Sequence, residues 1–170
     1  GITENVSPSP NRYTQDFPEG ALAGVVSKNG TVLVKRSGST FWEQVVSSTV
    51  FFQADEVRTT SRSFLEVYYS EGHYLRVEPS SNFVFQNQNE NTGKWEQLKM
   101  EAGKIWFKII KGTSMSKAFS IETPHASISV KGTLFSVMAP FGPISGFDGL
   151  IEVAQDGATQ LIEKGFETGI

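Results

Sequence analysis

Two histidines are the only imidazole groups in the sequence, so a histidine-based catalyst or metal site must use His73, His125 or both. His73 follows Glu71-Gly72 in a predicted turn, and His125 follows Pro124 directly. Neither has a second histidine at ligand spacing, because no His-x-His or His-Glu-x-x-His occurs. We therefore predict no metal site, and we interpret His73 as a surface residue of its turn.

Nucleophilic chemistry has little support either. Ser145 lies in Gly142-Pro143-Ile144-Ser145-Gly146, one residue later than a Gly-x-Ser-x-Gly elbow requires, and no helical pattern follows it. The chain has no cysteine, which excludes thiolate nucleophiles and thiolate metal sites. A carboxylate pair for glycoside hydrolysis stays open, since such a pairing is spatial. The residues predict a non-enzymatic protein without a cofactor.

Aromatic side chains offer a different chemistry, the stacking of sugar rings on a β scaffold. The candidates are Trp42, Trp95, Trp106, Tyr68, Tyr69 and Tyr74. Trp106 lies within an apolar strand pattern, which favours a structural role, whereas Trp95 borders a polar segment. If the chain binds carbohydrate, we expect Trp95 and Tyr74 to contact it.

Strands must position these residues, because apolar side chains alternate with polar ones in short runs separated by Gly, Asn, Asp or Ser. Ile105, Phe107 and Ile109, for example, share one face of a predicted strand. No long stripe of helical period occurs. We predict an all-β fold, a β-sandwich or rolled twisted sheet of about ten to fourteen short, mainly antiparallel strands.

Turn and loop signals divide the chain further. Asn29-Gly30 predicts a tight hairpin, and the polar run 86–93 predicts an exposed loop. Apolar residues change from even to odd positions at Gly132, which predicts a β-bulge there and a buried Phe135 beyond it. We expect an extended polar leader over residues 1–20 and a single β domain over residues 21–170.

Charge and hydropathy limit the partners. Fifteen basic and eighteen acidic residues give a net charge of -3 without a basic stripe, so nucleic acid is not expected as a partner. No apolar run approaches the roughly 20 residues that span a bilayer. Because the chain starts at Gly1, we expect a longer precursor whose other part holds the targeting or membrane-anchoring segment.

Several motifs occur together over about Ala23 to Thr168. The most specific runs from Thr123-Pro124 to Lys131-Gly132-Thr133-Leu134-Phe135, which is similar to a Thr-Pro strand and an Arg-Gly-Thr-x-Phe signature with Lys for Arg. The other motif positions are Asp55, Arg58, Thr59, Gly72, Gly103 and Trp106. Together these residues resemble the FecR domain family of bacterial envelope proteins. Ala54 and Glu71 depart from the family pattern, which usually has Gly and Asp there.

The resemblance implies a structural role for these motif residues and no active site. It implies an extracytoplasmic signalling or scaffold domain that acts through protein–protein interaction, such as the periplasmic part of a transmembrane sensor or anti-sigma regulator. Iron-siderophore signalling is one context of the family. We expect another envelope protein as the partner, and a cell-wall or carbohydrate-binding module is the alternative.

Overall fold

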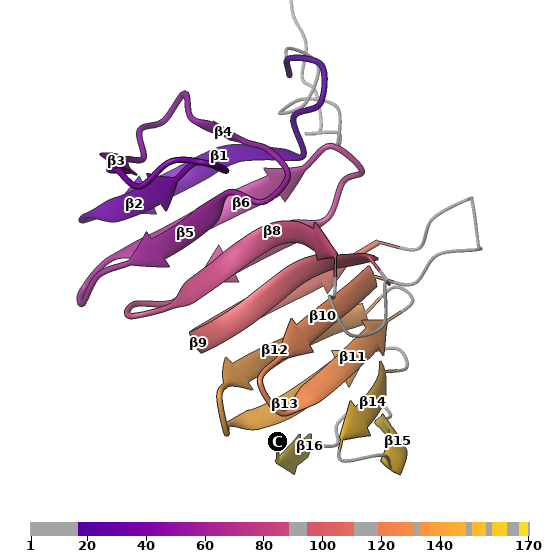
Figure 1. Cartoon of the computed structure of the whole chain (residues 1–170). Coiled ribbons are helices and arrows are strands. Elements are labelled where there is room, and N and C mark those ends of the chain that lie inside the picture. Colours follow the sequence, from indigo (N-terminus) through magenta and orange to yellow (C-terminus); the bar gives the residue numbers. More distant parts are fainter. Residues whose placement is uncertain are drawn as a thin grey trace, which may run out of the picture.

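The computed structural model describes residues 17–88, 95–110, 119–130, 133–148, 151–155, 158–162 and 167–169, and these ranges contain sixteen strands and no helix (Figure 1). The first eight are β1 (Ala23–Asn29), β2 (Val32–Lys35), β3 (Trp42–Gln44), β4 (Val50–Phe51), β5 (Glu56–Thr59), β6 (Phe64–Tyr69), β7 (Tyr74–Val77) and β8 (Asn82–Gln88). The others are β9 (Trp95–Ile109), β10 (Phe119–Thr123), β11 (Ala126–Val130), β12 (Thr133–Ala139), β13 (Pro143–Asp148), β14 (Ile151–Gln155), β15 (Ala158–Ile162) and β16 (Glu167–Gly169). The predicted all-β class is confirmed. Nothing in the described ranges offers a helix that could cross a membrane.

The strands form two sheets that share the 15-residue strand β9. Sheet A has the order β4-β1-β6-β7-β9-β12-β13-β16. Sheet B has the order β3-β2-β5-β8-β9-β10-β11-β14-β15. Every described pairing is antiparallel except that of β9 with β10. The first part of β9 belongs to sheet B and its second part to sheet A, so the strand turns the corner between them.

Chain order and spatial order run together along both sheets. In Figure 1 the colours pass from indigo at β1 to β4 through magenta and orange to yellow at β15, from one end of the molecule to the other. Each segment therefore packs mainly on segments close to it in sequence. The motif residues in the described part of the chain therefore lie at successive levels of the fold.

Alternating apolar residues fill the space between the sheets, as the sequence predicts. Ile105, Phe107 and Ile109 of β9 are buried, and Phe107 stacks on Phe135 of β12 with ring centroids 4.9 Å apart. The change from even to odd buried positions is confirmed as well. Ala126, Ile128 and Val130 are buried before it, and Phe135 and Val137 after it. The expected bulge at Gly132 lies outside the described residues.

The predicted hairpin at Asn29-Gly30 is wrong. β1 pairs with β4 and β6 in sheet A, whereas β2 pairs with β3 and β5 in sheet B, so the connection crosses from one sheet to the other. An Asn-Gly pair allows a sharp change of chain direction, which a connection between two sheets needs as much as a hairpin does.

Two strand boundaries also differ from the prediction. β8 extends through Gln88, where it pairs with Trp95, so residues 86–88 are strand and not loop; residues 89–94 lie outside the described part. The Thr-Pro motif, compared above with a strand, lies at a strand end, because β10 ends at Thr123. Pro124 and His125 form the two-residue turn between β10 and β11, with Thr123 opposite Ala126.

Candidate interaction surfaces

Asp55 fixes a turn between β4 and β5. Its carboxylate is almost fully buried, and Oδ2 accepts hydrogen bonds from Arg36 Nη1 at 2.6 Å and from the Phe52 backbone N–H at 2.8 Å. Arg36 Nη1 also donates to the Val50 carbonyl at 2.8 Å. Arg36, which the sequence reasoning missed, thereby covers the outer edge of the two-residue strand β4. The contacts of Asp55 therefore stabilise this turn.

Ala54, directly before Asp55, has a φ of 68°. This is the left-handed region, which costs a residue with a Cβ atom about 1–2 kcal/mol. The glycine that the family usually has at this position would avoid that cost. The departure at Ala54 therefore leaves the turn intact and strained.

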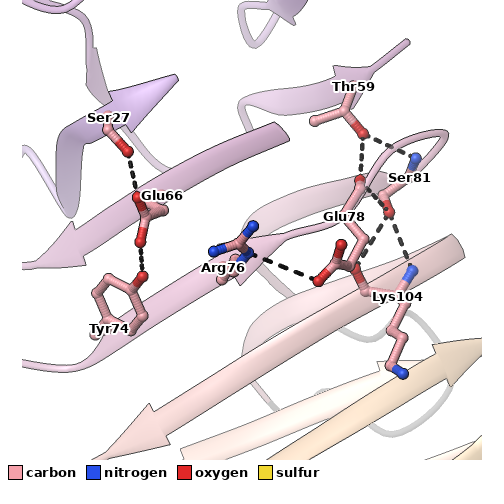
Figure 2. A network of polar contacts seen from close by, with 8 residues as sticks. All are labelled: Ser27, Thr59, Glu66, Tyr74, Arg76, Glu78, Ser81 and Lys104. Carbon is pink, nitrogen blue, oxygen red and sulfur yellow. Dashed lines mark hydrogen bonds and ion pairs between the residues drawn. The ribbon is translucent and has the colours of Figure 1, made fainter. Parts of the chain in front are cut away.

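Thr59 is the centre of a polar network that joins three levels of the fold (Figure 2). Its hydroxyl donates to the Glu78 carbonyl at 2.7 Å and accepts from the Ser81 N–H at 2.9 Å. The Ser81 hydroxyl in turn accepts from the Lys104 N–H at 3.0 Å, at the corner of β9 next to Gly103. Thr59 and Ser81 are buried, so the network stabilises the corner and is closed to solvent.

The Thr123-Pro124 motif forms a hairpin turn. The Thr123 hydroxyl is buried and accepts a 3.3 Å hydrogen bond from the His125 N–H across Pro124. Gly72 is buried in the β6–β7 turn, where its N–H donates to the Tyr69 carbonyl at 2.8 Å. Both motifs therefore shape turns.

The rest of the signature is described in part. Phe135 is buried, and Thr133 starts β12 opposite Ile109. Lys131 and Gly132 lie outside the described residues, so their predicted roles stay predictions.

The tryptophans with described side chains lie under cations. The Arg58 guanidinium is 4.4 Å from the Trp42 ring centroid, and Lys35 Nζ is 5.3 Å from it. Lys104 Nζ is 4.7 Å from the Trp106 ring centroid. A sugar would have to displace these cations to stack on the same ring face.

Of the two expected carbohydrate contacts, Tyr74 is engaged within the protein. Its hydroxyl donates to the Glu66 carboxylate, which also accepts from Ser27, so the three side chains form a row across β7, β6 and β1 (Figure 2). The backbone of Trp95 begins β9, and its side chain lies outside the described part. A sugar contact at Trp95 stays a prediction.

His73 is half-buried rather than on the surface, which corrects its interpretation. Its Nδ1 accepts a 3.2 Å hydrogen bond from the Ile110 N–H, and its ring packs edge-on against Phe119 with centroids 5.1 Å apart. Burial lowers the pKa of His73, and the nearby Glu71 carboxylate opposes that shift. No group of three or more metal-ligating side chains gathers in the described part of the chain.

Two turns present an exposed pair of stacked rings, Phe141 and His125. Phe141, in the β12–β13 turn, is 71% exposed and stacks on His125 of the β10–β11 turn with centroids 4.2 Å apart. Met138 lies beside them, against Gly142, and is 37% exposed. The sequence did not predict this cluster, because the two rings come from separate turns and meet only in the fold.

Comparison with known families agrees with the motifs. The model of the family described as FecR protein matches residues 55–146, more than half of the chain. The chain belongs to the FecR family. The matched region holds Asp55, Thr59 and Gly103, which stabilise a turn and the β9 corner, and it also holds Phe135 of the core.

Two crystal structures of a candidate anti-sigma factor from Parabacteroides distasonis ATCC 8503, at 1.65 and 2.50 Å, have the same fold. Each has a TM-score of 0.54 and 15% identity to this FecR chain, and covers 68% of it. The chain spans 58% of the length of that protein. Comparison with curated proteins gives no match.

Proposed function

We propose that this FecR domain is a non-catalytic signalling module that acts outside the cytoplasmic membrane by binding another envelope protein. Family membership and the fold shared with a candidate anti-sigma factor support a regulatory role. The motif residues with described side chains support a non-catalytic role, because the side chains of Asp55, Thr59 and Thr123 form hydrogen bonds with backbone groups of the protein.

The observation that carries the proposal is the stack of Phe141 on His125. Phe141 is 71% exposed, so most of its apolar surface stays in contact with solvent in the isolated domain, and aromatic residues are common anchors of protein interfaces. The two turns come from different sheets, β12–β13 from sheet A and β10–β11 from sheet B. The anchor therefore stands on a rigid base formed by both sheets.

A photo-crosslinking residue at position 141 of the full-length protein, expressed in its native cells, tests this proposal. We expect one discrete crosslinked envelope protein. The matched control places the same residue at position 41, because Phe41 is also exposed, at 77%, but lies on the loop before β3. The same adducts at both positions, or none at position 141, would refute the proposed interface.

A regulatory role is tested separately by the change Phe141→Ala in the native gene. We expect a limited set of transcripts to change as they do on deletion of the gene, while Phe41→Ala leaves them unchanged. Both are surface changes, which usually alter the free energy of unfolding by about 0.5 kcal/mol at most. Transcripts unaffected even by gene deletion would refute the signalling role.

Localisation is tested by fractionation. We propose that the domain is periplasmic and membrane-anchored through a segment beyond this chain. The full-length protein should then be degraded by protease added after the outer membrane is permeabilised, and should sediment with the membrane. Protection from the protease until the inner membrane is lysed would refute the periplasmic location.

A further inference from the structure

Six side chains alternate on the outward side of sheet A, away from the core. On β9 they are Lys104, Trp106 and Lys108. The β12 residues Met138, Ser136 and Leu134 lie directly opposite these three, respectively. We call these six residues the β9–β12 face. The intervening residues, such as Ile105, Phe107 and Val137, are buried in the core.

The β9–β12 face is apolar along its centre. Leu134 is 43% exposed and Met138 37%, while Trp106 is half-buried between them on the neighbouring strand. Ser136 is only 3% exposed although it points outward, so larger neighbours on this face cover it. Met138 lies against Gly142, which joins the face to the turn of Phe141.

Positive charge lies beside these apolar residues, with Lys104 opposite Met138 and Lys108 opposite Leu134. Lys104 Nζ is 4.7 Å from the Trp106 ring centroid. Lys104 and Lys108 take part in none of the ion pairs among the described residues, and Lys108 is exposed. Toward β7 and β6 the described carboxylates are already engaged. Glu66 of β6 accepts from Ser27 and Tyr74, and Glu78, just after β7, pairs with Arg76 at 3.7 Å. On β13, Asp148 stands opposite Leu134, and its side chain lies outside the described part. Among the described side chains, the two lysines thus have no carboxylate partner, in a chain with a net charge of -3.

The spacing of the two lysines along β9 determines the spacing of the acidic residues that a partner would need. Four residues of an extended strand separate Lys104 from Lys108, which is about 13 Å. We propose that the β9–β12 face binds an extended acidic segment of a partner protein, with two carboxylates four residues apart and an apolar residue midway. The carboxylates pair with Lys104 and Lys108, which draws the Lys104 ammonium away from the Trp106 ring, and the apolar residue covers Trp106 midway between the two lysines.

This inference rests on the proposed function, because it names the chemistry of the envelope partner. Charge complementarity supports it, because two lysines without a described carboxylate partner lie beside exposed apolar residues, and complementary charge gives an interface its register and specificity.

Fluorescence anisotropy tests the inference with an end-blocked labelled peptide centred on Glu-Thr-Leu-Thr-Glu. We expect saturable binding, about fivefold weaker for the Gln-Thr-Leu-Thr-Gln peptide because two exposed ion pairs are lost. Affinity should fall as NaCl rises from about 0.01 M to about 0.3 M. Equal binding of the two peptides, or none of either, overturns the inference.

The variant pair that assigns the site changes charge equally in two places. Lys104→Glu/Lys108→Glu should abolish the preference for the acidic peptide. Lys28→Glu/Lys35→Glu, with the same change in net charge on β1 and β2, should keep it. Loss of the preference in both variants overturns the site, since it would reflect net charge alone. Far-ultraviolet circular dichroism confirms that each variant folds.

A membrane is the competing occupant. Sedimentation with vesicles of phosphatidylcholine and phosphatidylglycerol that depends on Lys104 and Lys108, without selective peptide binding, overturns the inference in favour of an anionic lipid surface. Crosslinking from position 141 without acidic-peptide selectivity overturns only this inference. Selective peptide binding without any crosslinked envelope protein refutes only the proposed function.

Discussion

Gly103 lies against Ser81 so closely that a Cβ atom at position 103 would stand 2.0 Å from Ser81 Oγ and 2.4 Å from its Cα. The contact occurs where β9 passes from sheet B to sheet A. Gly103 has a φ of 97°, and the next residue, Lys104, donates its N–H to Ser81 Oγ at 3.0 Å. The corner that joins the sheets therefore depends on a missing side chain at one residue and a short polar one at the other.

Gly103→Ala should lower the free energy of unfolding by about 3 kcal/mol or more, because left-handed strain adds to a clash with backbone atoms. The measurement is urea unfolding followed by tryptophan fluorescence. Gly38→Ala is the control, since Gly38 has a φ of 78° but no atom within 4 Å of the added Cβ. It should cost only about 1–2 kcal/mol. Equal losses in the two variants would show that the contact with Ser81 is unimportant.

Ala54→Gly should stabilise the protein. Ala54 has a φ of 68°, and relief of its strain outweighs the added freedom of glycine in the unfolded chain, leaving a net gain of about 0.5–1 kcal/mol. Thermal unfolding reports the gain as a higher Tm. Ala126→Gly, within strand β11, is the control and should lower Tm. A lower Tm for both variants would contradict the strain at Ala54.

Arg36 and Asp55 should show strong coupling in a double-mutant cycle. Arg36→Ala leaves a nearly buried carboxylate without its cation, and Asp55→Ala leaves the Phe52 N–H without its acceptor. Each should cost about 2–3 kcal/mol, with a coupling of about 1–2 kcal/mol.

The control cycle uses Lys35 and Glu56, which pair at 3.4 Å with side chains 35% and 25% exposed. Its coupling should stay below about 0.5 kcal/mol, because solvent screens an exposed pair. Couplings of the same size in both cycles would mean that burial of Asp55 adds nothing to the first pair.

Alternation and glycine signals predicted much of this fold because they act over a few residues. The inward face of Ile105, Phe107 and Ile109 follows from period two alone, and Gly103 was among the motif positions for which the resemblance implied a structural role. Asn29-Gly30 was misassigned for the same reason. A local turn signal does not encode whether the next strand pairs with the last one or joins the other sheet.

The candidate surfaces were less predictable, since they depend on contacts between distant residues. Nothing near Asp55 in the sequence marks Arg36, 19 residues earlier, as its partner. Likewise, the stack of Phe141 on His125 requires two turns from different sheets to meet. The apolar residues Leu134 and Met138 read as strand residues, and only the pairing of β12 with β9 places them beside Lys108 and Lys104.

His73 should make folding stability depend on pH. Its folded-state pKa is lowered by burial, so below the ordinary value of about 6.5 the unfolded chain binds the proton more readily. Stability is therefore highest above that pH and falls as the pH drops toward the folded-state pKa, where a proton on Nδ1 would break the hydrogen bond from Ile110.

Urea unfolding at a series of pH values from about 8 to about 5 measures this slope. His73→Gln should flatten it, whereas His125→Gln, at an exposed turn, should keep it. An unchanged slope in His73→Gln would assign the acid sensitivity to carboxylates instead.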